Sequence, residues 1–529
     1  MDKIIKNCFV VRLCGAIARA FPGSLPGKLT AAVKRGYEKS VTAKAVTSFL
    51  SVCPKTVYSK LYAKFLSLNK FFMQIGASLH TASENSLIMR GLRAVSNSGA
   101  VNGSIILSSL KKLGMKRLLI AVFALYLPLD VLIRDVVGIE ILSSLWDEAL
   151  MLFCIMYIIF TVSRRSEITK PRITPLDAPL ILFLAVAVLV MCVVSPNFGV
   201  AFEGFRAVCQ FMLWFFVLTR LIENDDDFKT LYFTMCAMIC AVALHGIYQY
   251  ITCAPMPEQW VARAEAGVRT RVYSILGSPN VMGALMVMGA PMLASCAYYA
   301  KKLWVKCVMW GFVGIICLST LFTFSRGAWF GLTIAVIIFS LLVDRKLLLF
   351  GAVGIVAIIF CVPSISNRIA FLFTSDFATA NSTGGRGERW QIGLSLWRTN
   401  KLFGFGLGRY GGAIAMQNQH IDDLVYYYMD NYYLKTLTEM GLLGLISYVW
   451  LLLRNLVWSV RSVFRSRKSK ISVLVSGIIS GCSGVLAHSF FENIFEVPYM
   501  NAYFWGLAAA VMYVGFIRRR HRDSQSKTA

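Results

Sequence analysis

The fold class follows from apolar runs such as residues 177–194, which read DAPLILFLAVAVLVMCVV. This run contains one charged residue and is long enough to cross a ~30 Å hydrocarbon layer as an α-helix. Membrane strands would need alternating polar and apolar residues in a closed barrel, which this run lacks. Because similar runs recur, the sequence predicts an all-α integral membrane protein of about twelve transmembrane helices. The predicted spans are residues 118–134, 145–162, 177–194, 204–221, 229–251, 279–299, 304–323, 328–343, 347–363, 432–453, 471–488 and 500–517.

The composition of the chain agrees with a membrane protein. Of its 529 residues, 57% are hydrophobic and only 15% are charged, whereas a soluble protein carries about a quarter charged residues. The 14 cysteines are scattered, without a CxxC motif or a Cys/His cluster. We therefore interpret them as small apolar residues and expect no metal site.

The distribution of basic residues predicts the orientation. Residues 1–117 hold 19 Lys/Arg and three acidic residues, which favours the cytoplasmic surface beside anionic lipid rather than a nucleic-acid partner. With both termini in the cytoplasm, the cytoplasmic segments contain 41 of the 54 Lys/Arg and the outer side contains 13. The positive-inside rule then holds at every cytoplasmic turn.

The charge pattern also divides the chain. Residues 1–116 are predicted to form a basic cytoplasmic extension, in which segments such as 61–75 either lie on the membrane surface as helices or belong to a poorly ordered tail. Residues 117–517 form the polytopic membrane domain, and 518–529 a basic cytoplasmic tail. Residues 364–430 form one long outer loop, and long loops in compact proteins are commonly functional.

The outer basic residues differ in kind from the cytoplasmic ones. Eleven of the 13 are arginine, whereas the cytoplasmic set contains 22 lysines and 19 arginines. Arginine keeps its charge in a low-dielectric setting and binds phosphate or carboxylate through two parallel hydrogen bonds. The bias predicts an anionic ligand, although some arginines could instead pair with Glu203, Glu265 or Glu388. The eleven are Arg134, Arg206, Arg263, Arg269, Arg271, Arg326, Arg368, Arg386, Arg389, Arg398 and Arg409.

Two outer turns place polar groups at the start of a predicted span. Arg326 lies in the SRGAW segment at 325–329, where a charge near the membrane is costly unless it is paired or functional. Asn280 lies in the GSPN segment at 277–280, which opens a span with proline, and helix N-termini attract anions. Asn280 is therefore a candidate substrate-binding residue, with plain helix capping as the alternative.

The long loop and the span after it carry a second set of polar residues. Arg386 and Arg389 lie within the loop, and Asn431, Lys435 and Glu439 follow it. The last three share one face of a helix because they are four residues apart, so Lys435 and Glu439 are expected to pair. We expect this set to bind substrate; an ion pair that only holds the bundle together is the alternative.

The order of these motifs is similar to that of a known family. The shared residues are Ser278, Pro279 and Asn280, SRGAW at 325–329, Arg386 and Trp390, FGFGLG at 403–408, and Asn431, Leu434, Glu439, Gly441 and Gly444. Over about residues 118–517, the chain resembles the O-antigen ligase and polymerase superfamily. These bacterial envelope enzymes act on sugar chains carried by undecaprenyl diphosphate.

The resemblance implies a multi-pass glycosyltransferase of the bacterial cytoplasmic membrane, which polymerises or transfers undecaprenyl-diphosphate-linked glycans on the outer face. Its partners would be the lipid-linked donor, a glycan or lipid-glycan acceptor, membrane lipids and proteins of envelope polysaccharide assembly. It implies no nucleotide sugar, no cofactor and no metal. In this family arginines hold the diphosphate, so we expect Arg326 and Arg386 to act in catalysis. Arg206, Arg271 and Arg389 are expected to bind the substrate.

The sequence departs from the family at one position. A histidine often precedes the asparagine that corresponds to Asn431, and here that residue is Asp430; His420 lies ten residues earlier. We expect Asp430 to orient or deprotonate the acceptor hydroxyl. The alternative is that Asp430 only caps the following helix.

Two other classes of function remain open from the sequence. One is a membrane transporter of a small anion such as bicarbonate, which should place ionisable residues at mid-membrane between discontinuous helices. The other is a non-catalytic scaffold of an envelope complex. Most charges are predicted at span edges and in the outer loop, which favours chemistry at the membrane surface.

Overall fold

The computed structural model describes residues 113–163, 173–255, 270–361, 385–419, 427–466 and 469–518, with short stretches and single positions between 67 and 94 and between 366 and 382. The chain forms two compact units, one of residues 1–113 and 149–171 and one of residues 114–148 and 172–529. The candidate site lies in the second unit. Most of the predicted N-terminal extension, most of the tail, Glu265 and His420 lie outside the described residues.

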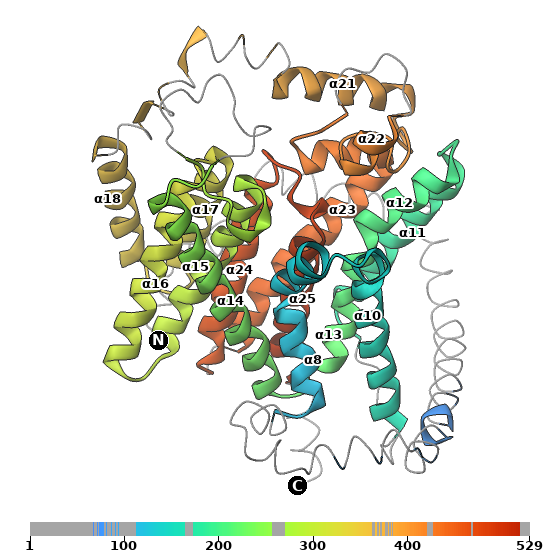
Figure 1. Cartoon of the computed structure of the whole chain (residues 1–529), viewed down its shortest axis with the longest axis horizontal. Coiled ribbons are helices and arrows are strands. Elements are labelled where there is room, and N and C mark those ends of the chain that lie inside the picture. The colour runs from blue at the N-terminus through green and yellow to red at the C-terminus, as the bar shows by residue number, and fades with distance from the viewer. Residues whose placement is uncertain are drawn as a thin grey trace, which may run out of the picture. The chain divides into compact units, whose positions relative to one another are not determined.

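The part of the chain that the structure describes is helical and contains no strand, only one isolated bridge between Gly411 and Tyr428. Each of the twelve predicted spans corresponds to a helix or to consecutive short helices (Figure 1). The elements are α8 (Met115–Ala124), α9 (Tyr126–Val131), η2 (Leu132–Val137), α10 (Glu140–Ser163), α11 (Asp177–Val193), α12 (Phe198–Cys209), η3 (Gln210–Leu213), α13 (Trp214–Leu221), α14 (Asp225–Ile251), η6 (Ser274–Leu276), α15 (Pro279–Tyr299), α16 (Leu303–Phe322), α17 (Arg326–Leu342), α18 (Lys346–Cys361), α21 (Arg386–Thr399), α22 (Ala413–Asn418), α23 (Tyr432–Arg465), α24 (Ile471–His488), η8 (Ile494–Glu496), α25 (Pro498–Met512) and η9 (Tyr513–Ile517).

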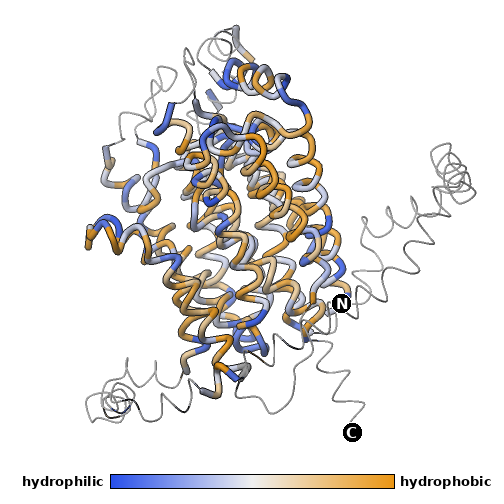
Figure 2. The backbone as a smooth tube through the Cα atoms, turned by 90° about the vertical axis from the view of Figure 1, so that its right-hand side faces the viewer, coloured by the Kyte–Doolittle hydropathy of each residue, from blue (hydrophilic) through white to orange (hydrophobic). Residues whose placement is uncertain are grey.

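Length and composition identify the helices that can cross a membrane. Among the described residues, eight helical segments are long and apolar enough, and α11 and α17 are shorter apolar helices. Figure 2 shows apolar residues along the long helices and hydrophilic residues gathered towards the bundle ends. The predicted all-α membrane fold is confirmed, while the count of twelve spans stays a prediction.

Small residues let three central helices approach closely. A Cβ atom at Gly481 would collide with the Met288 carbonyl of α15, and one at Gly484 would collide with the Gly331 carbonyl of α17. Membrane helices associate through such small-residue contacts, because lipid is as apolar as their side chains. Helix α24 therefore packs between α15 and α17, and this packing sets the positions of the α15 and α17 N-termini.

Helix α23 is broken at Gly441, where φ is 65° and ψ is −165°. Only glycine adopts this conformation without strain, and a Cβ atom there would collide with the Leu402 carbonyl. The break frees backbone groups of α23, and residues 401–406 bond to them. The four bonds run from Phe405 N to Thr438 O (2.8 Å), Gly406 N to Glu439 O (3.0 Å), Leu442 N to Lys401 O (2.9 Å) and Leu443 N to Leu402 O (3.1 Å).

This break was not predicted, because residues 432–453 have the length and composition of one continuous span. The helix also continues to Arg465. Basic side chains in its last turns lie beside an aromatic ring. The guanidinium carbons of Arg461 and Arg465 lie 4.5 and 5.3 Å from the centroid of the Trp458 ring. Cation–π contact of this kind offsets the cost of basic residues near the membrane.

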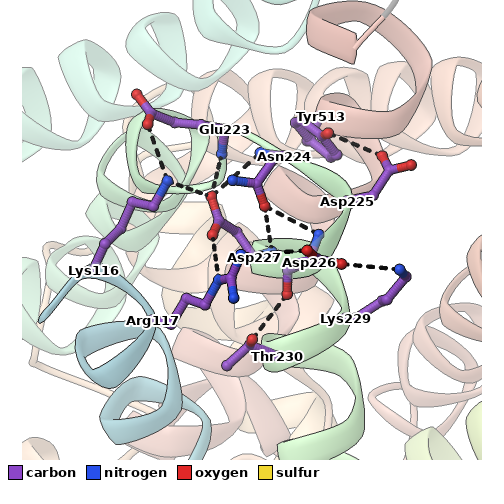
Figure 3. A network of polar contacts seen from close by, with 10 residues as sticks. All are labelled: Lys116, Arg117, Glu223, Asn224, Asp225, Asp226, Asp227, Lys229, Thr230 and Tyr513. Carbon is purple, nitrogen blue, oxygen red and sulfur yellow. Dashed lines mark hydrogen bonds and ion pairs between the residues drawn. The ribbon is translucent and has the colours of Figure 1, made fainter. Parts of the chain in front are cut away.

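An ionic network joins α8 and α14 at the bundle end away from α21 (Figure 3). Asn224 caps α14 in a capping box with Asp227. The fully buried Asp227 carboxylate accepts from the Glu223 backbone N–H at 3.0 Å. It also contacts Lys116 Nζ at 2.7 Å and Arg117 Nε at 3.3 Å.

The same turn of α14 also binds the last helical residues of the described chain. The Tyr513 hydroxyl donates to Asp225 Oδ1 at 3.1 Å, as Figure 3 shows. Arg518 pairs with the other oxygen of Asp225. Two segments distant in sequence, α8 and residues 513–518, are therefore fixed by one acidic helix turn, which is where a helix dipole also favours acidic residues.

Replacing Gly441 by alanine is expected to lower the stability of the protein. The strained backbone alone costs about 1–3 kcal/mol, and the added Cβ atom would push residues 401–406 off α23. The control is Gly314→Ala in α16, where a Cβ atom meets nothing within 4 Å. Thermal unfolding in detergent measures both variants; equal melting temperatures would contradict this account of the break.

Replacing Asp227 by alanine is also expected to destabilise the bundle. It removes a buried partner of two cations, a change that costs about 3–5 kcal/mol. The matched control is Asp226→Ala, because Asp226 is exposed and its ion pairs are worth at most about 1 kcal/mol. Melting temperatures should fall clearly for the first variant and little for the second, and the reverse order would refute the assigned role.

Candidate active site

Four helix N-termini meet at the end of the bundle that carries α21. Side chains cap three of them: Ser278 Oγ accepts from Val281 N (3.5 Å), Ser325 Oγ from Ala328 N (3.4 Å), and Asn431 Oδ1 from Tyr433 N (3.0 Å). These caps begin α15, α17 and α23. The fourth helix, α21, begins at Arg386. The positive ends of helix dipoles make such a place favourable for an anion.

Asp430 joins two of these helices through a pair of arginines. Arg389 places a terminal guanidinium nitrogen 2.9 Å from Asp430 Oδ2, and Arg386 Nε lies 3.6 Å from Oδ1. The two arginines share one face at the start of α21, since they are three residues apart. The Tyr410 hydroxyl holds this turn by donating to the Arg389 carbonyl at 2.7 Å. Asp430 is therefore an ion-pair partner, and the helix cap is Asn431 instead.

Glu492 lies beside this group, in the connection between α24 and α25. Its carboxylate accepts hydrogen bonds from the Asn280 amide and from the Tyr428 hydroxyl. Asn280 is also a partner of Arg271, whose terminal nitrogen lies 3.5 Å from the amide oxygen. Arg271 in turn donates from Nε to the Thr323 carbonyl at 3.0 Å, two residues before the cap of α17.

Arg326 is the first residue of α17, and the packing of α17 on α24 places it beside this region. The residue after it, Gly327, lies against the ring of the buried His488, because a Cβ atom there would come within 2.7 Å of His488 Cδ2. Arg386 is within electrostatic range of the same histidine. We call the combined group the arginine cluster: Arg271, Asn280, Arg326, Arg386, Arg389, Tyr428, Asp430 and Glu492.

Burial and charge set the protonation of the two carboxylates. Burial raises the pKa of Asp430 above its ordinary value, and the charges of Arg386 and Arg389 oppose that rise. Burial also raises the pKa of Glu492, and the nearby negative charge of Asp430 adds to the rise. Burial and the charge of Glu492 raise the pKa of Tyr428, so its phenol stays neutral and donates.

The arrangement suits a doubly negative group. The cluster contains four arginines and two carboxylates, so its positive charge exceeds its negative charge by two even when both carboxylates are ionised. Guanidinium groups bind phosphate oxygens through paired hydrogen bonds. In a buried setting such contacts are far stronger than in water. The cluster can therefore hold an anion and stabilise charge that develops on it.

Lys435 and Glu439 form the predicted pair, but inside the protein. The Lys435 ammonium lies 3.5 Å from Glu439 Oε2 and 3.5 Å from Glu496 Oε1, and it is almost fully buried. Residues of the 403–413 segment donate backbone N–H groups to both carboxylates: Gly408 to Glu439 at 2.8 Å and Ala413 to Glu496 at 2.9 Å. This geometry supports a role in fixing the loop on α23. Substrate binding by these residues stays a prediction.

Arg206 lies in a different group of residues. It pairs with Glu148 of α10, and its Nε donates to Gln210 Oε1 at 2.8 Å. Within the described residues, none of these contacts joins Arg206 to the arginine cluster, so its predicted contact with the diphosphate stays a prediction. Among the described ion pairs, Arg206 pairs with Glu148, and Arg386 and Arg389 pair with Asp430; the alternative of pairing with Glu203, Glu265 or Glu388 stays a prediction.

Sequence reasoning missed Glu492, Tyr428, His488 and Glu496. One signal was available for two of them: Glu492 and Glu496 stand four residues apart in the short connection after α24. A bundle end rich in arginine needs acidic partners, so acidic residues in its short connections are candidates. Nothing local marks Tyr428 or His488, because their importance comes from residues distant in sequence.

The comparison with known proteins bears on this end of the bundle. Residues 311–449 match the family model described as O-antigen ligase. This match confirms the O-antigen ligase and polymerase resemblance and supports glycosyl transfer of this type by a membrane protein. It spans about a quarter of the chain, from α16 into α23. No curated protein matches the sequence.

The O-antigen ligase match contains most, but not all, of the arginine cluster. Arg326, Arg386, Arg389 and Asp430 lie inside the matched residues, as do Asn431, Lys435 and Glu439. Arg271, Asn280 and Glu492 lie outside them and reach the cluster only through the packing of α15 and α24. The site is therefore larger than the family's matched segment.

Replacing Lys435 by methionine is expected to destabilise the protein strongly. The change leaves the Glu439 and Glu496 carboxylates buried together without a cation, which costs about 3–5 kcal/mol. Adding Glu439→Gln to this variant should restore part of the lost stability, since one of the two buried negative charges is then removed. Lys401→Met, at an exposed lysine of the same region, is the control. Unfolding in detergent tests the order; a double variant less stable than Lys435→Met would contradict it.

Proposed function

We propose that the chain is a membrane glycosyltransferase that polymerises or transfers undecaprenyl-diphosphate-linked glycans on the outer face of the bacterial cytoplasmic membrane. The single observation that carries the proposal is the arginine cluster, with two guanidinium groups on the one Asp430 carboxylate at 2.9 and 3.6 Å. The O-antigen ligase match over the same residues supports this activity.

In the proposed reaction the donor diphosphate lies against Arg386, Arg389, Arg326 and Arg271. An acceptor sugar hydroxyl attacks the anomeric carbon of the donor glycan. The bond from that carbon to the phosphate oxygen breaks, and its electrons leave with the lipid diphosphate. Arginines placed where this charge develops lower the barrier, because they favour the transition state over the ground state.

Asp430 positions the cations of this site. Its oxygens contact both guanidinium groups, so Arg386 and Arg389 stay ordered before the donor arrives. Preorganised charges stabilise a transition state without reorganising during the reaction. Asn280 links Arg271 to Glu492 and so belongs to the same binding surface. The acceptor is either the end of a growing chain or a different lipid-linked glycan.

An anion transporter is the second candidate, because α23 is discontinuous and carries buried charges at its break. Transporter sites use the open backbone groups of broken helices to bind their substrate. Here residues 401–406 bond to those groups, which favours surface chemistry. Uptake of labelled bicarbonate by proteoliposomes, without any glycan product, would support the transporter.

The remaining alternative is a non-catalytic scaffold of an envelope complex. Normal glycan synthesis after deletion of residues 364–430 would support it.

Arg386→Lys is expected to lower polymer or transfer product by about 10²–10³-fold, the usual effect of losing one positioned charge donor. Lysine keeps the charge but loses the paired hydrogen bonds. The matched control is Arg398→Lys, on the exposed last turn of the same helix, which should retain activity. Purified proteins are incubated with a lipid-linked repeat and the product ladder is measured; a full-rate ladder from Arg386→Lys would remove Arg386 from the mechanism.

A further inference from the structure

The diphosphate site leaves one buried carboxylate without a role. The Glu492 side chain is almost fully buried, yet no arginine pairs with it in the described ion pairs. Its hydrogen bonds come from neutral donors, the Tyr428 hydroxyl and the Asn280 amide, with the Asn493 backbone N–H at 3.3 Å. A buried carboxylate held by neutral donors keeps more of its proton affinity than one that is neutralised by cations.

Asp430 has the opposite surroundings. Guanidinium groups of Arg386 and Arg389 contact its two oxygens, and each stabilises the ionised form. A carboxylate that must hold two cations in place is a poor proton acceptor at the same moment. Both carboxylates are buried, but in the described ion pairs only Asp430 contacts cations, so Glu492 is the one that can accept a proton without releasing an arginine.

Tyr428 connects Glu492 to the reacting groups. Residues 427–430, just before α23, are fixed on the 403–413 segment by two backbone hydrogen bonds. These run from Gly411 N to Tyr427 O (2.8 Å) and from Met429 N to Gly411 O (3.4 Å). Tyr428 and Asp430 are two residues apart, so their Cα atoms lie within about 7 Å. The Tyr428 side chain is mostly buried, but its hydrogen bond to Glu492 lies at the edge of the buried region. An acceptor bound at that edge, next to the diphosphate, would meet the hydroxyl there, while Glu492 stays behind it.

We propose that Tyr428 and Glu492 form a proton relay that activates the acceptor hydroxyl. This inference rests on the proposed glycosyl transfer. As the acceptor oxygen bonds to the anomeric carbon, its proton passes to the Tyr428 oxygen and the Tyr428 proton passes to Glu492. The carbon–phosphate oxygen bond breaks and the lipid diphosphate leaves with the electron pair. Glu492 then releases its proton to solvent through the same path, which restores the carboxylate.

The relay predicts a pH dependence of turnover. The charged and titratable groups acting on Glu492 are Asp430, Arg386 and Tyr428. Glu492 must be ionised to accept a proton, so kcat falls as pH drops through its pKa. Because burial and Asp430 raise that pKa, the acid limb of the kcat profile should lie above the range of a free glutamate, about 4.3.

The test measures kcat, KM for the donor and binding of undecaprenyl diphosphate for full-length wild type, Glu492→Gln and Tyr428→Phe. A lost proton acceptor should lower kcat by about 10²–10⁴-fold, while donor binding stays within about threefold. Glu492→Gln should also lose the acid limb of the kcat profile. Glu492→Asp should retain part of the kcat and part of the acid limb. The control is Tyr433→Phe, which removes a hydroxyl bonded to the Leu486 carbonyl at 2.8 Å outside the relay.

Three outcomes overturn the relay. Wild-type kcat in both Glu492→Gln and Tyr428→Phe shows that the acceptor loses its proton elsewhere. Loss of donor binding without a change in kcat assigns Glu492 to substrate binding. Absence of any product from correctly folded wild-type protein removes the proposed glycosyl transfer itself, and this result is distinct from a failure of the relay alone. If Glu492→Gln does not fold, Tyr428→Phe decides, because phenylalanine preserves the packing.

Discussion

The structure depends on one constraint: within a membrane, backbone N–H and C=O groups must find partners inside the protein. A helix broken at Gly441 exposes such groups in the middle of α23, and the protein supplies their partners from residues 401–406. The long loop is thereby tied into the bundle by four backbone hydrogen bonds. A loop that lay over the bundle without these bonds would have no fixed register against α23.

This register determines where the charged residues lie. Once residues 401–406 are bonded to α23, the following glycines bring Gly408 N to Glu439 and Ala413 N to Glu496. The buried Lys435 ammonium then pairs with both carboxylates. On the same support, Tyr410 holds the start of α21 and so aims Arg389 at Asp430. The positions of the cluster's arginines thus derive from backbone pairing several residues away.

The sequence predicted the parts of this structure that depend on local patterns. Apolar length predicted the helices, four-residue spacing predicted the Lys435–Glu439 pair, and the proline of the GSPN segment predicted the start of a helix. The break in α23 stayed hidden, since a single glycine such as Gly441 does not by itself mark the end of a helix. Glu492 stayed hidden for a different reason: its partners Tyr428 and Asn280 lie 64 and 212 residues away. Only the packing of α15, α17 and α24 brings them together.

The acidic turn at the start of α14 has a consequence for the ends of the chain. Lys116 and Arg117, at the start of α8, pair there with Asp227. Arg518, after η9, pairs there with Asp225. The first and last described helices of this unit are therefore fastened at one helix turn. Removing the carboxylates of that turn would release the start and the end of the bundle together.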